Sequence, residues 1–289
     1  MSGIEPAGGT PRVDCLADAA GAIVFTVPAT DVAAADAAAG TDPADTDRAG
    51  SAPAPVLELR RRGRSAPGAP ADGDERDGTV RLPLSAAGAD GRARAELPLS
   101  VPLAEGHWDV YLGGRGVAAG FRDLRALLDR VPPAGADGVA ARVPCPAADG
   151  RLAVRVWHRF PHAEAGDLAF GPAGCTVEGA LYGAPLGPGA VAEARAGDRV
   201  YRTAAEGRDG TFRFTLDYRE LAAPPVTEER MYALWLRPAA DAEPVRISRV
   251  LDDVWDRRGS FAYPARRGEG YRAVPCYTNG NDLCVRVTG

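Results

Sequence analysis

The chain has 289 residues, which suits two domains of ordinary size, each able to bury a core. Its formal net charge of −5 argues against general nucleic-acid binding, which needs a basic face. All 34 basic residues are arginine, so a Schiff-base lysine and a Walker-type phosphate lysine are excluded. The bias toward arginine, alanine, glycine and proline is typical of a GC-rich genome and indicates an actinobacterium-like source.

The N-terminal residues contain no basic region followed by an apolar core, and no window approaches eighteen apolar residues. We therefore expect a soluble, cytoplasmic protein without a membrane span. Residues 1–10 are expected to be disordered.

A short motif occurs three times along the chain. Val143-Pro144-Cys145, a polar turn and Leu152 to Val156 return 131 positions later as Val274-Pro275-Cys276, a turn and Leu283 to Val287. A looser copy with Cys15 precedes Ile23 to Val27. Apolar residues alternate with period two in each copy, which predicts two short strands joined by a tight turn.

The first half alternates between strand and turn signals. Residues 29–55 are rich in alanine, aspartate, glycine and proline, so we expect a disordered insertion there. Residues 63–78 are expected to form a flexible loop. Strands at 79–84 and 92–97 flank Asp90-Gly91, a strong hairpin signal. Residues 107–112 alternate again and place Trp108 toward a core.

The second half repeats this order. We match Val177 to Leu57, Asp209-Gly210 to Asp90-Gly91, and Tyr232 to Trp108. Short strands separated by glycine and proline turns are typical of a sandwich of two sheets. The sequence therefore predicts an all-β fold of two tandem immunoglobulin-like antiparallel sandwiches. They cover residues 11–140 and 141–289, and the second includes an extra C-terminal hairpin at 271–287.

Two segments fit either a helix or a strand. Residues 121–131 and 245–254 carry apolar side chains at helical spacing, and we favour a strand that runs into a helical turn. The extra hairpin must pack on a sheet edge or belong to a further unit, because a two-stranded ribbon is not stable alone.

The segment from Tyr271 to Leu283 resembles β-sandwich modules that accompany actinobacterial glycosyltransferases and CDP-glycerol glycerophosphotransferases of cell-wall polymer synthesis. Chains of this kind are often labelled as transferases. The sequence contains no nucleotide-binding glycine-rich turn and no histidine pair suited to glycerophosphate transfer. The resemblance therefore implies an accessory role, with a transferase of either family or an anionic glycan as partner.

Groups that suggest chemistry are few. The weak metal candidates are His158, His162, Glu164 and Asp167, because imidazole and carboxylate together suit zinc or manganese. Pro161 breaks any helix that would align the two histidines, so we favour a solvated loop without metal. We expect no cofactor and no catalytic dyad.

Binding features concentrate near the C-terminus, where aromatic rings and arginines alternate. Aromatic faces stack on sugar rings, and arginine forks pair with phosphate or carboxylate. The alternative is that the aromatics complete the core while the arginines are solvated. The candidate binding residues are Trp255, Arg257, Arg258, Tyr263, Arg266, Arg267, Tyr271, Arg272 and Tyr277.

Three functions remain open from the residues. The first is a non-catalytic interaction or glycan-binding module associated with cell-envelope polysaccharide or teichoic-acid-like polymer synthesis. The second is a glycosyl or glycerophosphoryl transferase, and the third is a structural scaffold. The five cysteines favour free structural thiols in a reducing compartment, and Cys276 with Cys284 is the single pair expected to face each other.

Overall fold

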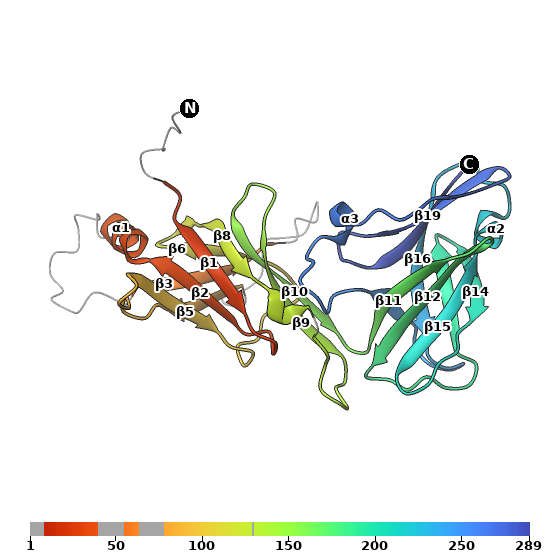
Figure 1. Ribbon diagram of the computed structural model, residues 1–289, viewed down its shortest axis with the longest axis horizontal. Coiled ribbons are helices and arrows are strands. Elements are labelled where there is room, and N and C mark those ends of the chain that lie inside the picture. Colours follow the sequence, from red (N-terminus) through yellow and green to blue (C-terminus); the bar gives the residue numbers. More distant parts are fainter. Residues whose placement is uncertain (1–8, 40–54, 64–77, 129) are drawn as a thin grey trace. The chain divides into compact units, whose positions relative to one another are not determined.

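The computed structural model describes residues 9–39, 55–63, 78–128 and 130–289. Strands dominate these residues, so the predicted all-β class is confirmed (Figure 1). The chain forms two compact units, Met1–Arg130 with Ala141–Trp157, and Val131–Ala140 with His158–Gly289. Within the described ranges, no helix is long and apolar enough to cross a membrane.

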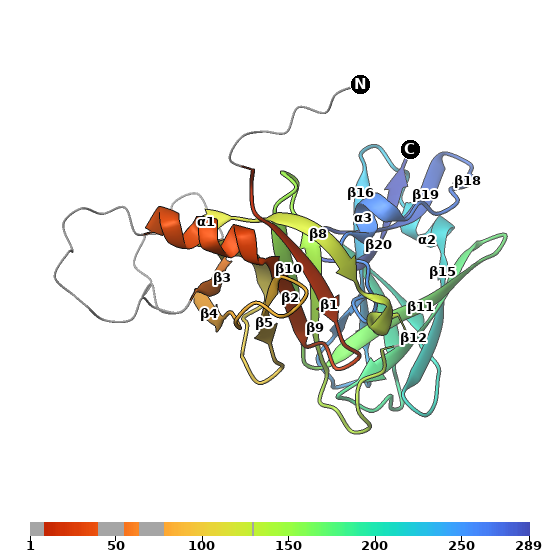
Figure 2. The same ribbon diagram turned by 60° about the vertical axis from the view of Figure 1, so that its left-hand side comes forward.

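The first unit is built from two sheets. One has the strand order β5-β2-β1-β8, and the other has the order β4-β3-β6-β10-β9 with β7 beside β6. Figure 2 shows β8 alongside β1, and these two strands are parallel. The strands are β1 Arg12–Ala17, β2 Ile23–Pro28, β3 Val56–Arg61, β4 Thr79–Pro83, β5 Arg92–Leu97, β6 Gly106–Leu112, β7 Arg115–Gly116, β8 Ala118–Asp123, β9 Val139–Pro146 and β10 Leu152–Arg159.

The side chains between these two sheets form one core. Alternation along the strands sends every second residue inward, as in β2, where Ile23, Phe25 and Val27 are all 0% exposed. On β10, Leu152, Val154 and Val156 join this core as the alternation predicts.

Alternation along β10 turns two further side chains away from this core, yet both are also buried. These are Ala153 and Trp157. The guanidinium carbon of Arg155 lies 5.0 Å from the centroid of the Trp157 ring. Both faces of this strand are therefore covered.

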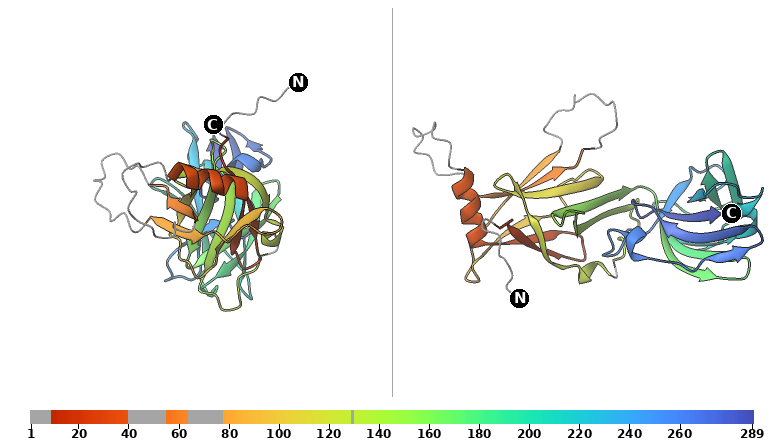
Figure 3. Two further views of the ribbon diagram at one scale, coloured as in Figure 1. Left: turned by 90° about the vertical axis from the view of Figure 1, so that its left-hand side faces the viewer. Right: turned by 90° about the horizontal axis from the view of Figure 1, so that it is seen from above.

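The expected disordered insertion begins with a helix, which corrects the prediction. Helix α1 spans Ala29–Ala39 and lies across the end of the strands of the first unit (Figure 3, right). Alanine has the highest helix propensity, and Asp31 lies in the first turn, where it complements the helix dipole. Val32 and Ala35 are buried in the core. The rest of the predicted insertion, residues 40–54, lies outside the described residues, as do 1–8 and 64–77.

The second unit contains the sheet order β15-β12-β11-β17-β16-β20-β19-β18, and β13 pairs with β14 and β16. Its core joins inward side chains of all the longer strands. The elements are β11 His162–Phe170, β12 Gly174–Tyr182, β13 Val191–Ala196, β14 Arg199–Ala204, β15 Thr211–Asp217, α2 Tyr218–Ala222, β16 Arg230–Arg237, β17 Val245–Ser248, α3 Arg257–Ser260, β18 Arg266–Gly268, β19 Tyr271–Tyr277 and β20 Leu283–Thr288.

The two units repeat one strand order. The path β5-β2-β1-β8 corresponds to β15-β12-β11-β17, and β4-β3-β6-β10-β9 corresponds to β14-β13-β16-β20-β19. Each unit has one parallel pair at the matching place, β1 with β8 and β11 with β17. The immunoglobulin-like assignment of these sandwiches stays a prediction.

The repeated motif occupies hairpins in both units. Its two matching copies are β9–β10 and β19–β20, which continue one sheet of each unit because β10 pairs with β6 and β20 with β16. The C-terminal hairpin is therefore not surplus. The division expected near Ala140 differs from the structure, since residues 141–157 belong with the first unit.

One predicted match and one predicted hairpin need correction. Val177 lies on β12 and Leu57 on β3, which occupy different sheets in the shared order. The turn at Asp90-Gly91 forms, with Gly91 at a positive φ of 69°, but its flanking strands separate. β4 pairs with β3 and β5 pairs with β2.

The match between Trp108 and Tyr232 holds. Both are 2% exposed and lie on the corresponding strands β6 and β16. Each donates a hydrogen bond to a backbone carbonyl, of Ala104 at 2.9 Å and of Leu221 at 2.8 Å. The ambiguous segment 121–131 begins in strand β8 and continues into the short 3-10 helix η2, Arg125–Leu127.

Candidate functional site

The predicted binding stretch follows β17 and runs through α3 into the hairpin β18–β19. The structure distributes its residues over two hollows and the protein interior. We name the hollows after Tyr271 and Cys276, which line one each.

Two of the predicted binding residues, Arg257 and Tyr277, are almost completely buried. Arg257 is 1% exposed and Tyr277 is 3% exposed. The Arg257 guanidinium donates to the carbonyl of Arg249 at 3.2 Å and pairs with the carboxylate of Asp252. Arg257 also lies 4.8 Å from the Phe261 ring centroid. Tyr277 is part of the core, as the alternative reading of the aromatics predicts, but that reading expected the arginines to be solvated and Arg257 is buried.

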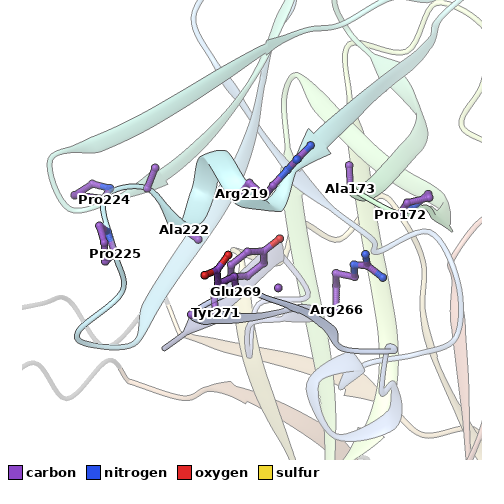
Figure 4. Close-up of a pocket in the computed structure, with 12 residues that line it drawn as sticks. Pro172, Ala173, Arg219, Ala222, Pro224, Pro225, Arg266, Glu269 and Tyr271 are labelled. Atoms are coloured by element: carbon purple, nitrogen blue, oxygen red, sulfur yellow. The ribbon is translucent and has the colours of Figure 1, made fainter.

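The Tyr271 hollow measures about 680 Å³ and contains two of the predicted residues, Arg266 and Tyr271. Figure 4 shows Tyr271 and Glu269 at its centre with Arg219 and Arg266 around them. The residues that line it are Pro172, Ala173, Arg219, Ala222, Ala223, Pro224, Pro225, Arg266, Gly268, Glu269, Gly270 and Tyr271.

The hairpin β18–β19 positions the tyrosine ring. Gly268 is the direct cross-strand partner of Tyr271. A Cβ atom at position 268 would lie 2.2 Å from Cε1 of Tyr271, so the ring lies over the glycine backbone. Only a residue without a side chain permits this contact, which explains glycine at this position.

The arginines of the Tyr271 hollow come from two elements. Arg266 lies on β18, and no ion pair or hydrogen bond of its side chain is seen within the described parts of the chain. Arg219 is the second residue of α2, and the side chain of the N-cap Asp217 accepts a hydrogen bond from the Arg219 backbone N–H at 2.9 Å. The Arg219 guanidinium lies 3.3 Å from the same carboxylate.

Arg266 and Arg267 are both exposed, but they do not share a face. Successive side chains of a strand point to opposite sides of a sheet. Accordingly, Arg266 lines the Tyr271 hollow and Arg267 does not. Arg267 is opposite Arg272, which lines the other hollow.

The Cys276 hollow measures about 780 Å³ and contains four of the predicted residues. Tyr263 is partly buried against the core, and its ring stacks with Phe261 at a centroid distance of 6.5 Å. Three arginines contribute to the lining. The residues are Glu229, Met231, Arg258, Phe261, Ala262, Tyr263, Arg272, Val274, Pro275, Cys276, Tyr277, Thr278, Asn279, Gly280, Cys284 and Arg286. Trp255 lines neither hollow.

The weak metal candidates do not form a site. The stretch expected to be a solvated loop continues as strand β11, and His162 is 0% exposed. Its Nε2 lies 2.7 Å from the Glu164 carboxylate, which also accepts hydrogen bonds from the backbone N–H groups of Val250 and Leu251. His158 stacks with a phenylalanine and Asp167 is exposed. The described residues contain no metal-binding group of three or more histidine, cysteine, aspartate or glutamate side chains.

Sequence reasoning missed a charged cluster on the outer face of β13 and β16. Glu193 is 0% exposed and pairs with Arg195, Arg202 and Arg237. Arg195 also lies 4.9 Å from the Trp235 ring centroid. The alternation of β16 predicts that Trp235 faces away from the core, but the partners of Glu193 come from three strands and cannot be read from one.

Comparisons with known proteins give little further information. No protein-family model matches the chain, and no curated protein matches it. Among solved structures, the chain is similar to a crystal structure of residues 217–571 of S. aureus TarS, at 14% identity and a TM-score of 0.27. That match covers 72% of this chain and 56% of the other.

Two further structural matches have lower TM-scores. A longer S. aureus TarS structure matches at 12% identity and a TM-score of 0.25, covering 73% of this chain and 37% of that one. A Ca²⁺-stabilised ice-binding adhesin of an Antarctic bacterium matches at 11% identity and a TM-score of 0.18, covering 95% of this chain and 59% of that one. Scores in this range do not establish a common fold.

Proposed function

We propose that the chain is a non-catalytic binding module and that its Tyr271 hollow binds an anionic glycan, a polymer of sugar or polyol units joined by phosphate. The observation that carries this proposal is the position of Arg219 and Arg266 around the exposed part of Tyr271 (Figure 4). The proposal places the module beside enzymes of cell-envelope polymer synthesis, in agreement with the resemblance of residues 271–283.

The lining supplies a contact for each part of such a ligand. The guanidinium groups of Arg219 and Arg266 can pair with phosphate oxygens through two parallel hydrogen bonds. Tyr271 offers a ring face for an apolar sugar face. The Glu269 carboxylate can accept hydrogen bonds from hydroxyl groups, which an uncharged hydrocarbon ligand would lack.

Several groups of the rim have restricted conformations. Pro172, Pro224 and Pro225 have fixed φ angles, and Tyr271 is held over Gly268. Rigid groups lose little conformational entropy on binding, so more of the contact energy contributes to affinity. A partner glycosyltransferase or glycerophosphotransferase would carry out the chemistry while this module holds the polymer.

The proposal is tested by replacing one of two adjacent arginines. Arg266→Ala removes a guanidinium from the Tyr271 hollow, whereas Arg267→Ala removes an equally exposed guanidinium from the opposite face of the same strand. We expect Arg266→Ala to weaken binding of poly(glycerol phosphate) oligomers by about 10-fold or more, since a charged hydrogen bond contributes about 1.5–3 kcal/mol. Isothermal titration calorimetry measures the affinity of the unaltered chain and of both variants for the polymer.

The comparison also includes Tyr271→Ala and a neutral dextran oligomer. Binding of the phosphate polymer should fall in Tyr271→Ala, and dextran should bind weakly to every variant. Equal affinities of Arg266→Ala and Arg267→Ala would contradict the proposed site. No binding of the polymer by the unaltered chain would contradict the proposed ligand class.

A further inference from the structure

Three sulfur atoms from three strands meet in the Cys276 hollow. The Sγ atoms of Cys276 and Cys284 are 3.4 Å apart, and the Sδ atom of Met231 is 3.7 Å from Sγ of Cys276. All three residues line the same hollow. The proposed glycan function uses none of them.

The strand register brings these side chains together. Cys276 on β19 is directly opposite Cys284 on β20, and Met231 on β16 is opposite Arg286, two positions along β20. Their neighbours Tyr277, Val285 and Tyr232 are in the core, so alternation puts the three sulfurs on the outer face. Met231 is 43% exposed and Cys284 is 1% exposed, so the cluster extends from the surface into the sheet.

The charge beside the cluster suits a metal-binding thiolate. A thiolate is the form of cysteine that binds metal, and a nearby positive charge favours that form. Arg286 lies directly opposite Met231 on β20 and lines the same hollow, so it supplies such a charge.

The separations between the sulfurs suit a shared metal ion. Sulfur ligands about 2.3 Å from one ion lie roughly 3.8 Å apart at the tetrahedral angle and roughly 4.0 Å apart in a trigonal plane. The observed 3.4 and 3.7 Å need only small side-chain rotations to reach these values. Two thiols and a thioether are soft ligands. Thiolates bind both Cu(I) and zinc, but the usual zinc ligands are cysteine, histidine and carboxylate, so the thioether favours Cu(I).

We propose that Met231, Cys276 and Cys284 form a binding site for one Cu(I) ion. Binding releases the thiol protons to solvent and changes no oxidation state. Arg286 offsets the negative charge of two thiolates with one monovalent cation. Phe261 and Tyr263 line the same hollow.

The first unit supplies an internal comparison. Its copy of the motif has Cys145 where the second copy has Cys276, but Ala153 replaces Cys284 at the offset of 131. The offset that matches Trp108 with Tyr232 also matches His107 with Met231. The first hairpin therefore lacks two of the three sulfurs, and Cys145→Ala serves as a control.

The test is an anaerobic titration of the reduced full chain with Cu(I) in competition with the chromophoric chelator bicinchoninate. We expect one Cu(I) per chain, with a thiolate-to-copper charge-transfer absorption in the ultraviolet. Cys276→Ser and Cys284→Ser should each weaken binding by at least about 100-fold, and Met231→Leu by about 10-fold. Cys145→Ala should bind as the unaltered chain does.

Met231→Leu keeps the test valid if a buried cysteine variant misfolds, because Met231 is at the surface and leucine has a similar volume. Circular dichroism checks the fold of every variant. If a variant with both Cys276→Ser and Cys284→Ser binds copper as strongly as the unaltered chain does, the proposed site is wrong. Unchanged binding in Met231→Leu would overturn the three-sulfur assignment.

Discussion

Glu193 lies on the outer face of β13 without contact with water, held by three arginines. Two of them, Arg195 and Arg237, have side chains about one-third exposed or less, and Arg202 is 60% exposed. A buried carboxylate without partners would cost several kcal/mol, so each ion pair reduces this cost. The ion pairs of the Glu193 carboxylate therefore link strand β13 to its neighbours β14 and β16.

The ion pairs of Glu193 should stabilise the folded chain at neutral pH and cease to do so in acid. Burial by itself raises the pKa of Glu193, but hydrogen bonds from Arg195, Arg237 and Arg202 outweigh it and lower the pKa from 4.5 to about 2. Because the folded-state pKa lies below the unfolded value, the stabilisation is complete above about pH 4.5 and is lost as the pH falls to about 2. The shift corresponds to about 3 kcal/mol.

Urea unfolding between pH 7 and pH 2 measures this contribution. Glu193→Gln should be less stable than the unaltered chain at pH 7, and the difference should vanish near pH 2. Glu178→Gln is the matched control, since Glu178 is 51% exposed in its ion pair with Arg213. A constant difference between Glu193→Gln and the unaltered chain across the pH range would refute the assignment.

Single residues also limit what the sequence can predict. Gly280 lies in the turn of the second hairpin copy, but the residue with positive φ there is Asn281, at 61°, which corresponds to Gly150 at 78°. Asparagine tolerates this conformation and its side chain bonds the carbonyl of Val254 and the N–H of Arg257. Val254 and Arg257 are distant from Asn281 in the sequence. The residues next to Arg257 are typical of an exposed segment, so its burial could not be inferred from them.

At the scale of elements, strands were predictable and their partners were not. Period-two alternation identified the hairpin copies and the strand with Trp108, because it reflects one buried face. Pairing depends on contacts between distant segments, so β4 and β5 were wrongly joined in one hairpin. The same limit applies to the Tyr271 hollow. Arg266 and Tyr271 were among the predicted binding residues, whereas Arg219, which lines the same hollow, comes from a different element and was not predicted.

The packing of helix α1 against the core of the first unit can be tested by substitution. Val32 is 9% exposed and packs in the first core, while Ala33 on the same helix is exposed. Val32→Asp should lower the free energy of unfolding by about 2 kcal/mol or more, because it removes an apolar contact and buries a charge. Ala33→Asp should change it by about 0.5 kcal/mol or less. Thermal melting that is equal for the two variants would mean that α1 does not pack.

At the scale of the whole molecule, the two units alternate along the chain. Residues 131–140 belong with the second unit, but 141–157 return to the first. The first unit thus takes its strand β10 from beyond a segment of the second. No single cut of the chain separates the residues of the two units.

This arrangement predicts which fragment folds. A chain ending at residue 157 keeps all of the first unit, whereas one ending at residue 140 loses Leu152, Val154 and Val156, each 0% exposed. Their burial contributes about 1.5–3 kcal/mol each, comparable together with the 5–15 kcal/mol stability of a typical domain. We expect cooperative melting by circular dichroism only from the longer fragment. The same melting temperature for both fragments would show that β10 is dispensable.

The pairing of β6 with β10 has a consequence for synthesis on the ribosome. Leu112 ends β6 and Leu152 begins β10, so the 39 residues between them must be translated before the pair can form. At about 5–20 residues per second this takes roughly 2–8 s. During that interval one edge of β6 has unpaired N–H and C=O groups, which invite pairing with another nascent chain. The order of the strands along the chain therefore leaves this edge of β6 without its partner for seconds during synthesis.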